Sequence, residues 1–206
     1  MIVTTLALGP VQTNCYLVAD ERTRQAVVID PSWSADLILA EARSVDLTIE
    51  MILITHGHFD HIGAAAEVNE ATGAPMVAHA REVELLQADG GAARFGFKIR
   101  SVPAPDRLVQ HGEVIVLGAL SFEVRYVPGH TVGHVAYIEH AQHAAFVGDV
   151  LFAGSIGRTD LPGGNYDTLI TSITDQLLTL PDEFVVYSGH GPPTTIGAER
   201  MTNPFL

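Results

Sequence analysis

Four side chains that can bind metal follow directly after an apolar run at positions 51–54. A run of this length, bounded by turn residues, is typical of a buried β-strand. After it come His56, His58, Asp60 and His61. Three imidazoles and a carboxylate packed together need many polar partners unless a cation organises them. The pattern therefore predicts a metal site at the end of a rigid element.

The spacing within this cluster predicts two metal positions. His56 and His58 stand two residues apart, so in an extended chain both point to the same side and can reach one ion. Residues 62–71 are rich in helix formers, which predicts a helix there. We expect Asp60 and His61 at the N-terminus of that helix, where they point a second pair of ligands into the same space.

Three later segments with strand-like sequences also lead into metal-binding residues. His130, Asp149 and His190 each stand beside a glycine after such a segment. Taken singly, each could be an ordinary turn or capping residue. Together with the first cluster they form a set of seven ligands, which is enough for two metal shells. Because the first four ligands lie in one half of the chain and the last three in the other, we expect the site where the halves meet.

The remaining candidates are assigned other roles. His134 is expected to donate or accept a hydrogen bond beside the ligands rather than bind metal directly. Cys15 is the only cysteine, which excludes an intrachain disulfide and a thiolate zinc site. Its apolar neighbours indicate a buried residue. The metals must therefore be held by His and Asp, and such sets with an open position are typical of catalytic sites.

Length and residue pattern predict one domain over residues 1–206. A chain of 206 residues with 47% hydrophobic residues can bury a substantial core. Strands are expected at 2–8, 14–19, 26–30, 51–54, 76–78, 114–117, 121–127, 135–139, 144–147 and 184–187, and helices at 35–43, 62–71, 81–88, 167–179 and the C-terminal tail. His111 and Gly112 are expected to form a hairpin turn. Many strands with interspersed helices predict packed sheets with helices outside.

Charge and hydropathy limit the classes of molecule that this protein is expected to bind. The net charge is −13, with 24 acidic and 11 basic residues, so the chain would repel a phosphate backbone and no nucleic-acid partner is expected. Two divalent ions would reverse the charge locally and allow a small anionic substrate. No apolar stretch approaches the roughly 18 to 20 residues of a membrane span, and the N-terminus lacks the pattern of a signal peptide. We therefore expect a cytoplasmic protein without a membrane partner.

The motifs resemble those of the metallo-β-lactamase superfamily, essentially from end to end. The resemblance rests on residues 55–61 and 128–134, on Gly148-Asp149 and on Gly189-His190. Two further stretches, 152–164 and 195–206, resemble the short bacterial glyoxalase II-like hydrolases. The resemblance implies an α/β (α+β) fold, a four-layered αββα sandwich with a dinuclear site on one edge of the two sheets.

The resemblance also implies a ligand set. The first metal would be held by His56, His58 and His130, the second by Asp60, His61 and His190, and Asp149 would bridge them. Both ions would share a water or hydroxide. Zinc is the expected ion, with iron and manganese as alternatives, because His and Asp ligands accept all three. Arg158 is expected either to contact an anionic substrate or to pair with Asp160.

The implied activity is hydrolysis of a small-molecule thioester of the S-(2-hydroxyacyl)glutathione type by a metal-bound hydroxide. Asp60 would position the attacking hydroxide as well as bind metal. A thiolate leaves without a dedicated acid because a thiol has a pKa of about 8.5. Long glyoxalase II enzymes add a C-terminal helical domain that contacts glutathione, whereas this sequence ends at Leu206, so the identity of the thiol stays open.

Three alternatives accompany this interpretation. A persulfide dioxygenase of the same fold would use one iron held by His56, His130 and Asp149, a set that suits non-haem iron and O₂. The sequence Gly189-His190-Gly191-Pro192 favours the hydrolase instead. A lactonase is the second alternative. A non-catalytic metal-binding module is the third, and it predicts no turnover in the metal-loaded protein.

Overall fold

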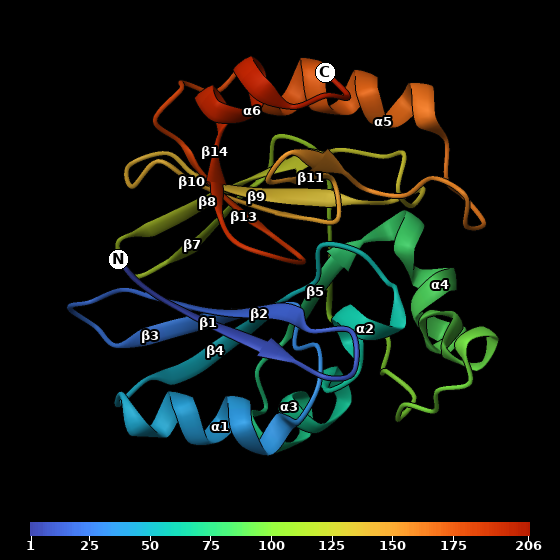
Figure 1. Ribbon diagram of the computed structural model, residues 1–206. Helices are drawn as coiled ribbons and strands as arrows, with labels where there is room; N and C mark the ends of the chain where they lie inside the picture. Colours follow the sequence, from blue (N-terminus) through green and yellow to red (C-terminus); the bar gives the residue numbers. More distant parts are fainter.

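The computed structural model describes residues 1–206 and contains two six-stranded β-sheets that lie face to face (Figure 1). The first sheet has the order β1 (Ile2–Leu8), β2 (Thr13–Ala19), β3 (Gln25–Ile29), β4 (Thr48–Leu53), β5 (Met76–His79) and β6 (Arg107–Val109). The second has the order β14 (Thr194–Thr195), β13 (Val185–Ser188), β10 (Ala144–Gly148), β9 (Val135–Glu139), β8 (Leu120–Tyr126) and β7 (Val114–Leu117). A separate small ribbon pairs β11 (Leu151–Phe152) with β12 (Ser155–Ile156).

Helices cover the outer faces of both sheets (Figure 1). On the first sheet lie α1 (Ala35–Ser44) and α3 (Ala65–Thr72), and on the second lie α5 (Tyr166–Ser172), which continues into the π-helical η3 (Ile173–Leu177), and α6 (Ile196–Thr202). The remaining helices are α2 (Phe59–Ile62), η1 (Ala80–Glu82), α4 (Val83–Gln87) and η2 (Asp89–Phe95). No helix is both long and apolar enough to cross a membrane.

Three apolar clusters lie between the four layers. The first contains Ile52 and Ile38 and joins the first sheet to its helices. The middle cluster contains Phe122 and Phe146 and fills the space between the sheets. The third contains Leu169 and joins the second sheet to α5. Each sheet therefore buries both faces, which confirms the αββα sandwich expected from the sequence.

The segment between β6 and β7 differs from the prediction. The hairpin expected at His111 and Gly112 does not form, because β6 pairs with β5 and β7 pairs with β8. The segment instead carries the chain from the first sheet to the second. Short apolar strands such as these can pair with either neighbour, and the local sequence does not select between a hairpin and a crossover.

The helix expected over 62–71 is interrupted near its start. The backbone N–H of Ala64 donates to the carbonyl of Pro31 at 2.9 Å, so it does not extend α2. At Gly63 a Cβ atom would lie 2.4 Å from the carbonyl oxygen of Ser32, so only glycine lets the two backbones approach this closely. Asp60 and His61 therefore lie inside the short helix α2 and not at the N-terminus of the long helix.

Candidate metal centre

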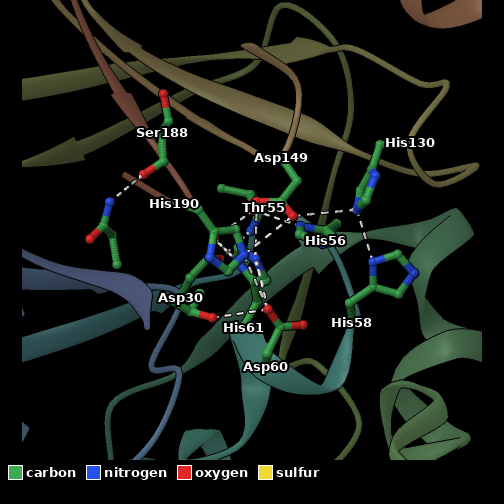
Figure 2. A network of polar contacts seen from close by, with 12 residues as sticks. Asp30, Thr55, His56, His58, Asp60, His61, His130, Asp149, Ser188 and His190 are labelled. Carbon is green, nitrogen blue, oxygen red and sulfur yellow. Dashed lines mark hydrogen bonds and ion pairs between the residues drawn. The ribbon is translucent and has the colours of Figure 1, made fainter. Parts of the chain in front are cut away.

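All seven predicted ligands lie together at one edge of the sandwich (Figure 2). Four of them come from the segment after β4, in the first sheet. The other three follow β8, β10 and β13, in the second sheet. The site therefore lies where the two halves of the chain meet, as the order of the motifs predicts.

The first group of nitrogens comes from His56, His58 and His130. One ligand atom from each lies within 4.8 Å of the others, and all three residues are buried. The Nδ1 of His58 is 2.9 Å from the Nε2 of His130. Burial and the neighbouring His130 lower the pKa of His58 to about 3, and burial lowers the pKa of His56 well below its ordinary value. These imidazoles are neutral at pH 7, which is the state that binds metal.

The second group consists of Asp60, His61 and His190, whose ligand atoms also lie within 4.8 Å of one another. The Nε2 of His190 is 3.3 Å from the Oδ2 of Asp60. Burial lowers the pKa of His190, but hydrogen bonds to Asp149 and Asp60 outweigh it and raise this pKa to about 9. The pKa of His61 is raised well above its ordinary value, since the nearby carboxylates overcome the effect of burial. Without metal, the histidines of this second group are therefore protonated at pH 7, whereas those of the first group are neutral.

Asp149 lies between the two groups. Its Oδ1 is 3.2 Å from the Nε2 of His61, and its Oδ2 is 3.7 Å from the Nε2 of His130 and 3.5 Å from that of His190. One carboxylate therefore faces nitrogens of both groups, which is the position that a bridging ligand requires.

The donor set suits divalent metal ions. The Nδ1 of His56 contacts the hydroxyl of Thr55, whereas the Nε2 of the same ring is buried without a hydrogen-bond partner. A buried nitrogen without a partner costs free energy unless it binds something else. Neutral imidazoles and carboxylates around this atom are ligands that zinc, iron and manganese accept.

Asp30 supports the site and was missed in the sequence. Its carboxylate accepts hydrogen bonds from the backbone N–H of Thr55 at 2.7 Å, from the hydroxyl of Thr55 at 2.6 Å and from the Nδ1 of His61 at 2.9 Å. It thus leaves the Nε2 of His61 for the site and fixes the ring. A signal existed, because Asp30 is a polar residue directly after the buried strand β3, the same pattern that identified Asp149.

Glu82 also supports the site, and nothing in the sequence around it pointed to this role. Its buried carboxylate accepts hydrogen bonds from the backbone N–H of Gly57 at 2.7 Å, from the backbone N–H of Gly133 at 2.6 Å and from the hydroxyl of Thr131 at 2.7 Å. Burial raises the pKa of Glu82, while these three donors act in the opposite direction.

His134 and Cys15 occupy the places expected of them. The Nε2 of His134 accepts a hydrogen bond from the backbone N–H of Asp149 at 3.1 Å, and the ring stacks on His56 with centroids 4.6 Å apart. His134 therefore packs behind the ligands. Cys15 is fully buried, and burial raises the pKa of its thiol far above the ordinary value.

A cavity of about 290 Å³ opens in front of the ligands. Five of its lining residues are hydrophobic, and they are Val11, Phe59, Phe95, Phe97 and Leu161. Arg158 also lines this cavity, and its guanidinium forms two hydrogen bonds of 2.7 Å with Asp160. Of the two roles considered for Arg158 from the sequence, the ion pair with Asp160 is present, in a residue that also lines the cavity.

Comparison with known proteins shows which family has a similar sequence and fold. The profile of the Metallo-beta-lactamase superfamily matches residues 8–190. Hydroxyacylglutathione hydrolase GloC from Haemophilus influenzae is 42% identical over 95% of this chain and 93% of its own length. The crystal structure of BLEG-1 B3 metallo-beta-lactamase has a TM-score of 0.95 and 39% identity, and covers 100% of this chain and 99% of its own.

Two further solved structures are similar to this chain, and one of them contains two iron ions. TTHA1623 in a di-iron-bound form has a TM-score of 0.91 and 40% identity, and covers 98% of this chain and 100% of its own. ETHE1 from Myxococcus xanthus has a TM-score of 0.82 and 35% identity, with 99% of this chain and 84% of its own covered.

Proposed function

The chain belongs to the metallo-β-lactamase superfamily of metal-dependent hydrolases, and from this premise we propose that it hydrolyses thioesters of the glyoxalase II type. The substrates are small S-(2-hydroxyacyl)glutathione-like compounds. The observation that carries the proposal is the position of Asp149, which faces two complete ligand groups in front of one cavity. The similarity to GloC over 95% of the chain supports the choice of substrate class.

In this proposal two divalent ions occupy the site, with zinc, iron or manganese as candidates. His56, His58 and His130 would hold the first ion, Asp60, His61 and His190 would hold the second, and Asp149 would contact both. When bound, such ions lower the pKa of water toward about 7 and stabilise negative charge that develops on a carbonyl oxygen.

Asp60 has a second task, which is to orient the attacking water. Its Oδ2 accepts a hydrogen bond from the hydroxyl of Thr13 at 2.9 Å, which fixes the carboxylate. Burial raises the pKa of Asp60, but His61, His190 and Thr13 outweigh burial and bring this pKa to about 2. The carboxylate is therefore anionic at neutral pH. Asp60 lines the cavity, and its Oδ1 has no hydrogen-bond partner within the protein. This oxygen can accept a hydrogen bond from an O–H of the attacking water.

The leaving group explains why no further acid is needed. A thiolate is stable at neutral pH because a thiol has a pKa of about 8.5. Phe59, Phe95 and Phe97 form an apolar wall of the cavity, which in this proposal would limit the access of bulk water to the reacting carbonyl. Acyl transfer to water then requires only the ions, Asp60 and a positioned substrate.

The direct test is to load the purified protein with zinc, iron or manganese and to measure cleavage of S-lactoylglutathione. We expect cleavage by the loaded protein and its loss, by about 100-fold or more, in Asp60→Asn, because the substitution removes both a ligand charge and the orienting carboxylate. Asp167→Asn is the matched control, since this carboxylate is exposed on α5. A loaded protein that binds two ions and cleaves no thioester would contradict the proposal.

A second candidate is persulfide oxidation with one iron, and the similarity to ETHE1 favours it. In that case His56, His130 and Asp149 would hold the iron. The complete second group around Asp60 supports the hydrolase, because a mononuclear enzyme does not require it. Uptake of O₂ with glutathione persulfide by a protein with one iron, together with no thioester cleavage, would select this alternative. Lactones and β-lactams belong in the same substrate panel.

A further inference from the structure

A smaller hollow, here called the side slot, opens beside the metal-facing cavity. It has a volume of about 150 Å³ and shares three lining residues with that cavity, namely His58, Phe95 and Leu161. Leu85 of α4 adds a further apolar side chain, and Arg94 of η2 lines it as well. The side slot is thus an apolar recess that is continuous with the candidate active site and carries one cation.

Two glycines shape the wall of the side slot. Gly90 and Gly91 both have positive φ angles, of 61° and 73°, which favour glycine. A Cβ atom on Gly90 would lie 2.2 Å from the backbone nitrogen of Phe59, so η2 packs with bare backbone against the metal-binding segment. A Cβ atom on Gly91 would meet nothing within 4 Å, so the space beside it is open. Part of the wall of the side slot is therefore formed by the backbone of η2, beside the side chains that line the rest.

Arg94 is free to bind a ligand. It forms no ion pair and no side-chain hydrogen bond, whereas five other arginines each pair with a carboxylate. Arg158, the other arginine near the site, is among these five, since it binds Asp160. In a chain with a net charge of −13, an unpaired guanidinium beside the active site attracts an anionic group that the rest of the surface repels.

We propose that the side slot receives the thiol half of the substrate and that Arg94 pairs with a carboxylate on it. This inference rests on the proposed function, because a 2-hydroxyacyl group is neutral and the negative charge of the substrate must then lie on the thiol half. The volume of the side slot, about 150 Å³, is roughly half that of the cavity of about 290 Å³ in front of the ligands. The side slot accordingly holds a short segment of the thiol half, and Arg94 meets its charged end at the rim.

Binding of a ligand that cannot be cleaved tests this assignment. S-methylglutathione is a thioether with two carboxylates and one ammonium group, and its diamide keeps the ammonium but lacks both carboxylates. We expect the metal-loaded protein to bind the acid about tenfold more tightly than the diamide by calorimetry, because a charge-assisted hydrogen bond contributes on the order of a tenfold change in Kd. Arg94→Gln should abolish this preference, and Arg94→Lys should restore part of it.

Arg100→Gln is the matched control, because this exposed arginine pairs with Glu70 and does not line the side slot. It should keep the preference of the wild-type protein. The inference is wrong if the wild-type protein binds neither ligand, or if Arg94→Gln prefers the acid as strongly as the wild type does.

A parallel assay separates this inference from the proposed function. Cleavage of a lactoyl thioester of N-acetylcysteamine, whose thiol is neutral, tests hydrolysis alone. One outcome is that the protein cleaves this thioester, but Arg94 has no effect on its preference for S-methylglutathione over the diamide. In that case the side-slot assignment fails and the proposed function stands. If the preference depends on Arg94 but neither this thioester nor S-lactoylglutathione is cleaved, the proposed function fails and the anion site stands.

Discussion

The carboxylate of Glu82 accepts a hydrogen bond of 2.7 Å from the backbone N–H of Gly57, which lies between the two histidines of the first motif. The same carboxylate accepts another, of 2.6 Å, from Gly133, which follows the loop of His130. A single buried side chain therefore ties together the loops that carry His58 and His130, whose ring nitrogens are 2.9 Å apart.

Replacing this carboxylate should loosen the first ligand group. In Glu82→Gln the NH₂ group of the new amide cannot accept a hydrogen bond, unlike the carboxylate oxygen that it replaces. At least one buried N–H or O–H donor would therefore lose its acceptor. We expect a loss of about 1–3 kcal/mol in the free energy of unfolding by urea, and weaker zinc binding in a competition assay with a chelator. Glu84→Gln on the exposed face of α4 is the control. Unchanged zinc affinity in a folded Glu82→Gln protein would contradict this role.

The two ligand groups should lose metal independently. His190→Ala removes a ligand from the second group only, and His58→Ala removes one from the first only. After loading with metal and removal of the unbound ions, we expect elemental analysis to find about one ion fewer in each variant, because losing one of the four protein ligands of a site weakens it strongly. Asp149→Ala should lower occupancy of both sites, since its carboxylate faces both groups. Full occupancy in Asp149→Ala would argue against a bridge.

Metal binding to the second group should strengthen as the pH rises. The pKa of His190 is about 9 without metal, so at pH 7 this imidazole is protonated and must release its proton to become a ligand. His61 behaves in the same way, because its pKa is also raised. The affinity for zinc should therefore increase with pH until about pH 9, and calorimetry in buffers of different ionisation enthalpy should detect proton release. Binding of both ions without proton release would refute this account.

Gly63 should be sensitive to a single methyl group. In Gly63→Ala the new Cβ atom would lie 2.4 Å from the carbonyl oxygen of Ser32 and 2.6 Å from the ring of Trp33. The backbone must then move, and we expect a loss of about 1–3 kcal/mol in the free energy of unfolding of the metal-free protein. Since α2 carries Asp60 and His61, the midpoint of metal loading should shift as well. A variant with wild-type stability would show that the contact of α2 with this loop is adaptable.

The layers and the cluster of ligands could be predicted because they depend on local patterns. Each of the ten expected strands is present, and the ligands follow strands in the order that the motifs suggest. The interruption at Gly63 could not be predicted, since it depends on a hydrogen bond between Ala64 and Pro31, which are distant in sequence. The role of Glu82 has the same origin, because its partners, Gly57 and Gly133, come from both sheets' loops and leave no trace in the sequence around it.

The pairing of short strands also escaped prediction. The segments on either side of His111 look like two arms of a hairpin, but they belong to different sheets. The short strands β11, β12 and β14 were not expected, because two residues are too few for an alternating pattern to be recognised. Asp30, in contrast, could have been found by applying the rule that identified Asp149.

The central claim, a thioester hydrolase that uses two ions, is tested most directly by titrating the metal-free protein with zinc while S-lactoylglutathione cleavage is followed. We expect the activity to rise until two equivalents are bound and then to stay constant, because each ligand group holds one ion and Asp149 faces both. Absence of cleavage at two equivalents would contradict the claim. So would full activity at one equivalent.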